Sequence, residues 1–550
     1  SRFTREDFHR PAYLTNALFR DLARQGWPTL PVYDPNGYMF HSPSPALPLR
    51  DGGKHNIQTD NIYQQISLIL EPIKNWITHV DFNYRINTVN NHWDTQTLYN
   101  HDVQGNPYPI GYYQDTEAHE DQTKENYMNF NAYTEYSHSL ESGHNFKGMI
   151  GFQAEEMKQQ TFGATRKGII VPELPEIDIT TGLDYTGKVV TPSVNGSRAA
   201  WSTAGFFGRI NYDYNNKYYF SASYRRDGSS RLSRESRWGD FWSISGSWRL
   251  SEEAFMQDIK HVLTDAKLRV SYGVNGTQPT DLYGYLGVYE FGYNYAGNGG
   301  SAEARFDNPN MKWEKNYATN VGLDVTLWNR LSITAEWYNR DTKDLLMSKN
   351  ISAVPGVINS SGEATMLMNV GSMRNRGVEF EIKSTNIQNK DWYWSTSLNF
   401  GHNKNTLLKL DGEQNEMIDG IAIHRIGEAY QSFYAYEYAG VDPETGSEMF
   451  YINGEDGSRE TTIHSNEANK VIIGSPDPKL TGGLTNFVSW KFIDLNFTLT
   501  YSLGGHAYDA ATWLQSNGGT YNYVGNVPAY YKIEDTWKQP GDNAKLPLFA

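Results

Sequence analysis

Residues 375–405, "NRGVEFEIKSTNIQNKDWYWSTSLNFGHNKN", contain two runs in which apolar and polar side chains alternate strictly. The apolar positions of the first run are Val378, Phe380 and Ile382, and those of the second are Trp392, Trp394, Leu398 and Phe400, with Thr396 among them. A period of two is typical of a β-strand with one apolar face. That face turns either to the core of a soluble sheet or to the lipid around a membrane barrel, and this stretch alone leaves both open.

The composition favours the membrane. Of 550 residues only 38% are hydrophobic, yet 14% are aromatic, with 38 Tyr and 15 Trp. Transmembrane strands need an apolar side chain only at every second position, and aromatic girdles mark both interfaces. A soluble all-β protein, such as a propeller or an array of sandwiches, stays open on composition alone.

Charge and cysteine content exclude several functions. The formal net charge of −15 argues against nucleic acid as a partner, because phosphate binding needs a basic surface. The chain has no cysteine, which excludes thiol catalysis and thiolate metal sites and suits a protein that crosses an oxidising periplasm. No run of about 18 apolar residues is present, so no transmembrane helix is expected.

Fourteen stretches have the alternation and length of tilted membrane strands. They lie near residues 60–71, 77–88, 126–139, 145–157, 199–213, 217–226, 240–250, 266–275, 313–327, 331–341, 377–385, 391–401, 480–490 and 492–503. The connections between them differ by parity: those after odd strands are short, and nearly all those after even strands are long. An up-and-down outer-membrane barrel sorts its connections in this way, with tight periplasmic turns and long external loops. The sequence therefore predicts an all-β fold, a large antiparallel transmembrane β-barrel with at least 14 strands.

The same parity predicts the domain organisation. Residues 1–59 are expected to form an external loop segment, 60–503 the barrel strands with their loops, and 504–550 a second external loop segment. Because free sheet edges are unfavourable in lipid, further strands are expected, and the barrel in this chain is predicted to be incomplete at both ends.

Several sequence blocks resemble one known family. They are "YRRDGSSRLSRESRWGDFWSISGSWRLSEEAFM" (224–256), "KLRVSYGVNGTQ" (267–278), "NPNMKWEKNYATNVGLDVTLWNRLSITAEWYNRDTKDLLM" (308–347), "NVGSMRNRGVEFEI" (369–382), "AGVDPETGSEMFY" (439–451) and "EDTWKQPGDNAKLP" (534–547). In this order they resemble the barrel of the SusC/RagA family of TonB-dependent (TonB-linked) outer-membrane transporters.

The resemblance implies about 22 strands in the full protein, an N-terminal plug domain, and a SusD-like surface lipoprotein that caps the outside. It also implies import of oligosaccharides or peptides, energised by the TonB complex, across the outer membrane of a Gram-negative bacterium of the Bacteroidetes type. The chain departs from the family because the plug, the TonB-contacting segment and the final strands are not in it, so it is interpreted as the C-terminal barrel portion.

Aromatic residues in the predicted external loops are the candidates for contact with substrate or partner. They are Trp93, Tyr112, Tyr113, Tyr289, Phe291, Tyr293, Tyr295, Trp513, Tyr521 and Tyr523. Flat aromatic faces stack on sugar rings, which favours oligosaccharides over peptides. The alternative is that these side chains order their own loops or dock the lipoprotein, since aromatics are enriched at protein interfaces.

Other charged groups are interpreted as structural. Glu379 and Glu381 share one face of a strand, where a polar lumen wall is favoured over a glycosidase pair. The block Arg225, Arg226, Arg231, Arg234 and Arg237 could clamp an anionic ligand. The family resemblance implies instead a structural hairpin with Asp227 and Gly228 in its turn and with arginines paired to carboxylates.

No enzymatic activity and no cofactor are expected. The 14 histidines are scattered without an HExxH motif, so no metal site is predicted. Carboxylates in 441–460 leave calcium in an external loop as an open alternative, although "NGEDG" is more simply a turn between two short strands. The predicted function is TonB-dependent nutrient import with a SusD-like partner; the alternative is an outer-membrane receptor or adhesin barrel without active transport, and a barrel-borne hydrolase is the least favoured.

Overall fold

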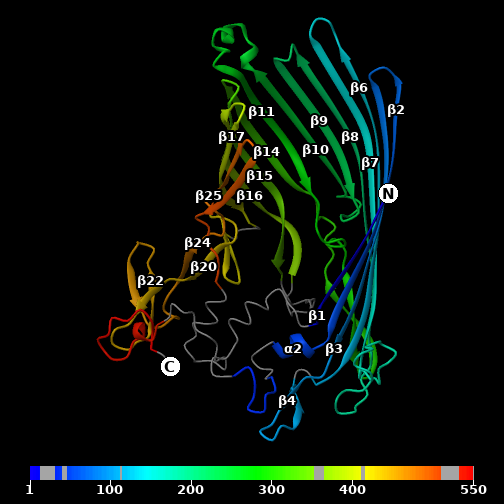
Figure 1. Cartoon of the computed structure of the whole chain (residues 1–550), viewed down its shortest axis with the longest axis vertical. Helices are drawn as coiled ribbons and strands as arrows, with labels where there is room; N and C mark the ends of the chain where they lie inside the picture. Colours follow the sequence, from blue (N-terminus) through cyan, green and yellow to red (C-terminus); the bar gives the residue numbers. More distant parts are fainter. Residues whose placement is uncertain are drawn as a thin grey trace.

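The computed structural model describes residues 1–12, 31–39, 46–111, 114–351, 365–410, 415–509 and 532–548. Within them, one antiparallel sheet of 15 strands in the order β1-β2-β3-β6-β7-β8-β9-β10-β11-β14-β15-β16-β17-β25-β26 forms a single curved wall (Figure 1). Each strand pairs with the neighbouring large strands in the sequence, as in an up-and-down barrel. The bounds are β1 Arg2–Pro11, β2 Lys54–Ile73, β3 Trp76–Thr95, β6 Glu117–Ser139, β7 His144–Lys167, β8 Ser193–Tyr214, β9 Tyr218–Ser229, β10 Trp238–Arg249, β11 Leu263–Thr277, β14 Glu314–Leu327, β15 Leu331–Asn350, β16 Thr365–Gln388, β17 Trp392–Lys409, β25 Leu480–Trp490 and β26 Ile493–Leu503.

All fourteen predicted strands are present, and one more was missed. Residues 1–59 were expected to be loop, but β1 pairs with β2 from Arg2 opposite Tyr63 to Pro11 opposite Lys54. The sequence of β1, RFTREDFHRP, has charges on both faces and therefore no apolar alternation. Its attachment is polar instead, since Arg5 Nε donates to Asp60 Oδ1 at 2.7 Å.

The two ends of the sheet differ. At one end, called the turn end, strands are joined by short connections such as 74–75, 140–143, 215–217 and 389–391. At the other, the loop end, the connections are long, as in 96–116, 168–192, 278–313 and 410–479. The predicted alternation of short and long connections is confirmed except around β10, where the loop-end connection 230–237 is shorter than the turn-end connection 250–262 (Figure 1).

Asparagines allow the tight turns. Asn215 and Asn216 have φ values of 50° and 56°, and Trp328 and Asn329 have 51° and 54°. Two successive residues with positive φ match the right-handed twist of the paired strands, and Asn tolerates this region better than most residues.

Smaller elements fill the loop end. They are the helix α2 Ala46–Asp51; the hairpins β4 Tyr99–His101 with β5 Pro107–Pro109, and β12 Val288–Tyr295 with β13 Asn298–Arg305; the sheet of β18 Glu416–Asp419, β19 Ala422–Arg425, β20 Ser432–Tyr436 and β24 Lys470–Gly474; and the sheet of β21 Tyr438–Val441, β22 Glu448–Asn453 and β23 Arg459–Thr462. Of the three 3₁₀ helices in the described residues, η2 Leu250–Glu252 and η3 Ala254–Ile259 lie at the turn end, in the connection from β10 to β11, and η4 Ile533–Asp535 follows the large sheet. None of the helices in the described residues has the length and apolarity to cross a bilayer.

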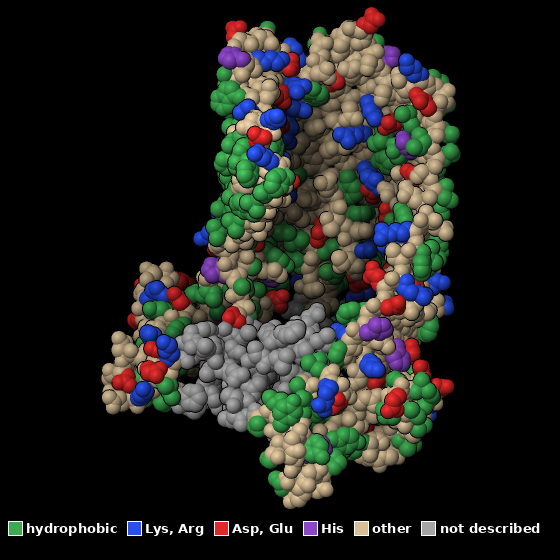
Figure 2. Space-filling view, viewed as in Figure 1, with side chains coloured by type: hydrophobic (Ala, Val, Ile, Leu, Met, Phe, Trp, Pro, Cys, Tyr) green, Lys and Arg blue, Asp and Glu red, His purple; other side chains and the backbone are tan. Residues whose placement is uncertain are grey.

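The two faces of the sheet differ in chemistry. On the outer face Phe380 and Phe400 stack with ring centroids 4.9 Å apart, and hydrophobic side chains gather along the outer edges of the wall that are in view (Figure 2). The inner face is polar and charged: Arg269 Nε lies 2.7 Å from Asp324 Oδ2. The predicted polar lumen wall at Glu379 and Glu381 agrees with this arrangement, because these residues alternate with the outward Phe380 on β16.

Aromatic side chains mark the limits of the apolar outer band. Trp392 and Trp490 stack at 5.5 Å beside the turn end, and Trp248 lies near the same end of β10. Trp238 lies ten residues away on β10, about 33 Å along the strand at the usual rise. With the usual tilt of barrel strands this spacing matches an apolar band of about 25 Å between two girdles.

Strands β6 and β7 extend farther toward the loop end than predicted. β6 begins at Glu117, whereas the sequence predicted a start at residue 126. β7 ends at Lys167, whereas the sequence predicted an end at residue 157. In these extensions both faces carry polar side chains, so the period-two apolar signal disappears although the strand continues.

Candidate functional site

The structure separates the predicted contact residues. Trp93 was expected in a loop but lies in β3, because this strand continues to Thr95. Tyr289, Phe291 and Tyr293 lie on the β12–β13 hairpin and are 61%, 83% and 49% exposed. Tyr112, Tyr113, Trp513, Tyr521, Tyr523 and the side chain of Tyr295 lie outside the described residues. Trp93 differs from the three hairpin aromatics because it lines a cavity.

That cavity, called the Trp93 pocket, lies on the inner face at the loop end. Its volume is about 620 Å³. It is lined by Ala12, His55, Trp93, Thr95, Gly111, Gln114, Asp115, Glu117, Lys167 and Tyr185. The pocket thus combines two aromatic side chains, two carboxylates, one cation and several hydrogen-bonding groups.

The register of the sheet builds the floor of the pocket. One row of paired residues crosses five strands: Arg10, His55, Trp93, His119 and Thr165 lie opposite one another in turn. In an antiparallel sheet such partners project from the same face at close range. Residues far apart in the sequence therefore form one continuous strip.

Trp93 is held by a stacked partner. Its ring centroid lies 4.7 Å from that of His119, with an interplanar angle of 18°. His119 is fixed in turn by Asp121 Oδ1, 2.9 Å from Nε2, and by Thr165 Oγ1, 2.6 Å from Nδ1. A ligand would meet an indole whose orientation is already set, which lowers the entropic cost of binding.

His55 presents a hydrogen-bond donor without a partner. Arg10 Nε donates to His55 Nδ1 at 3.2 Å, and a second guanidinium nitrogen lies at 3.1 Å. Because arginine can only donate, Nδ1 is the acceptor and the proton of the neutral ring is on Nε2. Nε2 is buried and makes no hydrogen bond within the described residues. Such an atom gains most from a ligand oxygen that can accept its proton.

Another wall of the pocket comes from the end of β7 and from the loops. Lys167 Nζ lies 2.6 Å from Asp115 Oδ2, and the backbone amide of Tyr185 donates to Asp115 Oδ1 at 2.8 Å. This pair leaves Glu117 as the second carboxylate of the lining, so the lining carries more negative than positive charge. An anionic ligand is disfavoured, whereas a neutral polar ligand with one flat apolar face fits the groups present.

Sequence reasoning did not find His55, His119 or Glu117. Each lies in a polar stretch that has no motif, and their meeting depends on the pairing register of β2, β3 and β6. A strand prediction extended through residue 95 would have placed Trp93 on β3, but not beside these residues.

The arginine block is structural in part. Arg225 and Arg226 pair with Asp227 and Asp240, with N–O distances of 2.6 and 3.6 Å, as expected. The predicted turn is wrong, however, because Asp227 and Gly228 lie within β9, opposite Gly239 and Trp238. The connection is residues 230–237, which reaches inward and buries Leu232 against Phe241, Met311 and Trp313.

The loop 441–460 contains the expected turn. β22 and β23 pair from Phe450 opposite Thr462 to Asn453 opposite Arg459, which places "NGEDG" between them. Asp456 accepts from the Ser458 hydroxyl at 2.6 Å, and Asp442 accepts from Thr445 at 2.5 Å. These carboxylates cap their own turns, while calcium in this loop stays untested.

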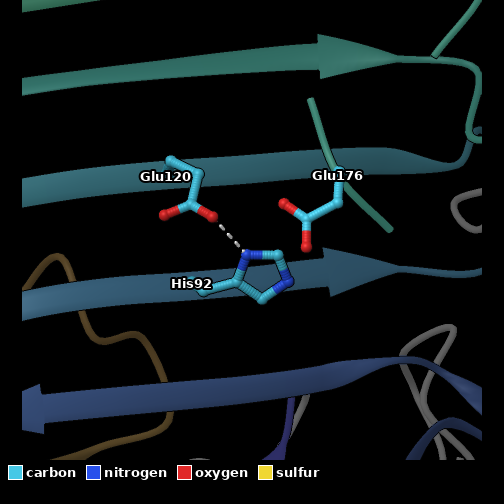
Figure 3. Close-up of side chains that lie close together, drawn as sticks. All are labelled: His92, Glu120 and Glu176. Carbon is cyan, nitrogen blue, oxygen red and sulfur yellow. Dashed lines mark hydrogen bonds and ion pairs between the residues drawn. The ribbon is translucent and has the colours of Figure 1, made fainter. Parts of the chain in front are cut away.

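A second group of polar residues lies behind the Trp93 pocket, on the outer face. His92, Glu120 and Glu176 bring one ligand-type atom each to within 4.8 Å of one another (Figure 3). His92 and Glu120 are the sequence neighbours of Trp93 and His119, and they pair across the same two strands.

Comparison with known proteins identifies this fold. Residues 7–541 match the family described as TonB dependent receptor-like, beta-barrel. The chain belongs to this family. TonB-dependent receptor barrels lie in the outer membrane, so the apolar outer band faces lipid.

Individual relatives agree with the SusC/RagA resemblance. The chain is 31% identical over 402 residues to the TonB-dependent receptor SusC of Bacteroides thetaiotaomicron, covering 69% of this chain and 38% of that protein. It is 30% identical over 443 residues to the TonB-dependent receptor P3 of Formosa agariphila, covering 76% and 42%. The RagAB peptide transporter aligns with a TM-score of 0.79 at 25% identity, over 90% of this chain and 53% of that one.

This TonB-dependent receptor barrel therefore spans less than half the length of these two curated relatives. Both are receptors by name and neither name describes an enzyme, in agreement with the expectation of a non-enzymatic protein.

Proposed function

We propose that this chain is the barrel portion of a SusC/RagA-type importer, which takes up large nutrients across the outer membrane together with a SusD-like lipoprotein. The family match carries the proposal. In it, the turn end faces the periplasm and the loop end faces the outside, where the lipoprotein closes over the long loops. A plug domain fills the lumen and connects it to the TonB complex.

The inner wall near the turn end suits such a plug. It has a hollow of about 660 Å³ with serine, asparagine and arginine groups in its lining, among them Ser221, Ser245, Asn211, Arg269 and Asn320. Most groups of this lining are neutral hydrogen-bonding side chains, which hold a protein surface mainly without charge pairing, so that a pulling force can release it.

We propose oligosaccharides as the favoured substrate class and peptides as the second. The Trp93 pocket supports this preference, since it offers an indole face, a donor on His55 that has no partner in the described part of the chain, and the carboxylate of Glu117. RagAB is a peptide transporter, which is why peptides stay the second candidate.

The test is purification of the full-length protein from its native outer membrane, followed by mass spectrometry of proteins and of bound glycans or peptides. Recovery with a surface lipoprotein and bound oligosaccharide is the expected result. Bound peptides would keep the importer and overturn the glycan preference. A barrel recovered without lipoprotein, with no growth defect on any glycan or peptide after deletion of its gene, would favour a receptor or adhesin instead.

A further inference from the structure

We propose that His92, Glu120 and Glu176 form a binding site for a divalent transition-metal ion such as Zn²⁺, which fastens the loop 168–192 to the outer wall of the barrel. The site lies outside the lumen and the Trp93 pocket. Metal binding there therefore does not depend on the proposed import function.

The three ligands come from separate segments. His92 projects from β3 and Glu120 from β6, at directly opposed positions, and Glu176 reaches over them from the β7–β8 loop (Figure 3). His92 Nδ1 lies 2.6 Å from Glu120 Oε1. One imidazole nitrogen with two carboxylate oxygens is a donor set that Zn²⁺ accepts, with further positions left for water.

The loop that carries Glu176 is ordered by its own backbone. Ile169 and Thr180 form an antiparallel bridge, and Gly168 donates to the Thr116 carbonyl at 2.9 Å. Within the turn, Ile179 donates to the carbonyl of Glu176 at 3.0 Å. The side chain of Glu176 thus extends from a folded turn that already lies beside β6, which reduces the conformational entropy that metal binding must overcome.

The charges at the site call for a cation. Among the described residues, no lysine or arginine forms an ion pair with Glu120 or Glu176, and the partner of Glu120 is His92 alone. Two carboxylates with one imidazole carry a net negative charge of about two when the ring is neutral. A divalent ion neutralises it and removes the repulsion between the carboxylates.

The geometry needs a small adjustment. Ligand atoms around a tetrahedral Zn²⁺ lie about 3.4 Å apart, so His92 Nδ1 and Glu120 Oε1, now 2.6 Å apart, must open, and atoms separated by up to 4.8 Å must close by about an ångström. Glu176 is exposed and Glu120 has a side chain 47% exposed, which leaves both free to rotate inward. The ion takes the place of the hydrogen between His92 Nδ1 and Glu120, and the imidazole then carries its proton on Nε2.

An ion at this place supports the pocket on the other side of the sheet. His92 and Glu120 are paired across β3 and β6 and face outward. The next pair along these strands is Trp93 and His119, which face inward and stack on each other. The loop held by Glu176 continues to Tyr185, which lines the Trp93 pocket. The metal therefore connects the outer wall, the loop and one wall of the pocket.

The test uses the full protein in detergent, stripped of metal and titrated with ZnCl₂ and separately with MgCl₂ in a calorimeter. The variants are His92→Gln and Glu176→Gln; the matched controls are Glu173→Gln, an exposed carboxylate in the same loop, and His464→Gln, an exposed histidine in a distant loop. We expect one Zn²⁺ site that is weakened at least tenfold in both site variants and unchanged in both controls, with no comparable Mg²⁺ binding.

Hydrogen exchange gives a second measurement. Amides of residues 168–185 are expected to exchange more slowly with Zn²⁺ and to return to the faster rate with EDTA, in the wild type and the controls but not in Glu176→Gln. Absence of Zn²⁺ binding, or Zn²⁺ binding and protection that survive both site substitutions, would overturn the proposal. Neither result bears on import, because the import test rests on the lipoprotein and the bound substrate.

Discussion

Phe380 on β16 and Phe400 on β17 lie directly opposite each other and stack on the outer face, with ring centroids 4.9 Å apart and an interplanar angle of 19°. Their neighbours Glu381 and Asn399 are also opposed, on the inner face. The four positions define, within one ladder step, which side of this wall meets lipid and which meets the lumen.

A positive charge should lower the stability of the barrel on the outer face of this wall but not on the inner face. Phe400→Lys is expected to lower the free energy of unfolding in lipid vesicles by about 2–4 kcal/mol, because the ammonium group enters the apolar band. Asn399→Lys, its matched control, faces the lumen across from Glu381 and should change stability little. Urea unfolding followed by tryptophan fluorescence measures both; equal losses would contradict the assignment of the faces.

The Trp93 pocket and the exposed β12–β13 hairpin can be separated by substitution. Trp93→Ala is expected to weaken substrate binding about tenfold or more, because it removes an ordered aromatic face inside a cavity. Tyr289→Ala, on the hairpin, should leave substrate affinity unchanged. Calorimetry with the native substrate distinguishes the two, and the reverse order of effects would move the contact site to the hairpin.

The lumen ion pairs can be tested at Arg269, which lies 2.7 Å from Asp324 and 3.5 Å from Glu336. Arg269→Met leaves two carboxylates on facing strands without their cation and should destabilise the barrel by about 1 kcal/mol, since the group is partly exposed to solvent. Adding Asp324→Asn should recover part of the loss. If the double variant is less stable than Arg269→Met alone, repulsion between the carboxylates of Asp324 and Glu336 is not the cause of the loss.

The sheet of β18, β19, β20 and β24 should weaken in acid. Burial of the ring lowers the pKa of His424 from its ordinary value of 6.5, although Asp419 acts in the opposite direction. The folded sheet therefore binds fewer protons than the unfolded one, and its stability is full above pH 6.5 and is lost as the pH falls through the lower folded pKa. Hydrogen exchange of residues 415–436, corrected for the intrinsic pH effect, should show more opening at about pH 5 than at about pH 7.5.

His424→Phe keeps a ring against Tyr430, on which His424 stacks at 4.4 Å, and should remove this acid effect. His464→Gln is the control and should retain it. An acid effect that persists in His424→Phe would assign the titration to another group.

The alternation of single strands was enough to predict the fold. In the lipid band one face must be apolar, so every transmembrane strand carries the period-two signal, and the parity of the connections then indicates the topology. β1 was not predicted, because its contacts to β2 are polar, as between Arg5 and Asp60, and its sequence has no apolar alternation. The extensions of β6 and β7 were not predicted, because both of their faces carry polar side chains.

The candidate site was predictable only in part. Trp93 could be singled out for its residue type, but the side chains around it belong to other strands and depend on register. The three residues of the proposed metal site lie at positions 92, 120 and 176, and no linear motif connects them. Pairing information is what the single sequence lacks, and a shift of one residue in β3 would exchange Trp93 with His92 between the two faces.

The neighbour-to-neighbour order of the sheet has a consequence for folding. Because each large strand pairs with those next to it in the sequence, the wall can grow by adding one hairpin at a time to an existing edge. At the turn end, most of these additions close only a short turn. The joining of β17 to β25 must instead bring together ends separated by residues 410–479, at a greater loop-closure entropy. Early folding of the two small sheets in that segment would shorten the effective loop, so the rate of this step should depend on their stability and not on the hydrophobicity of the strands being joined.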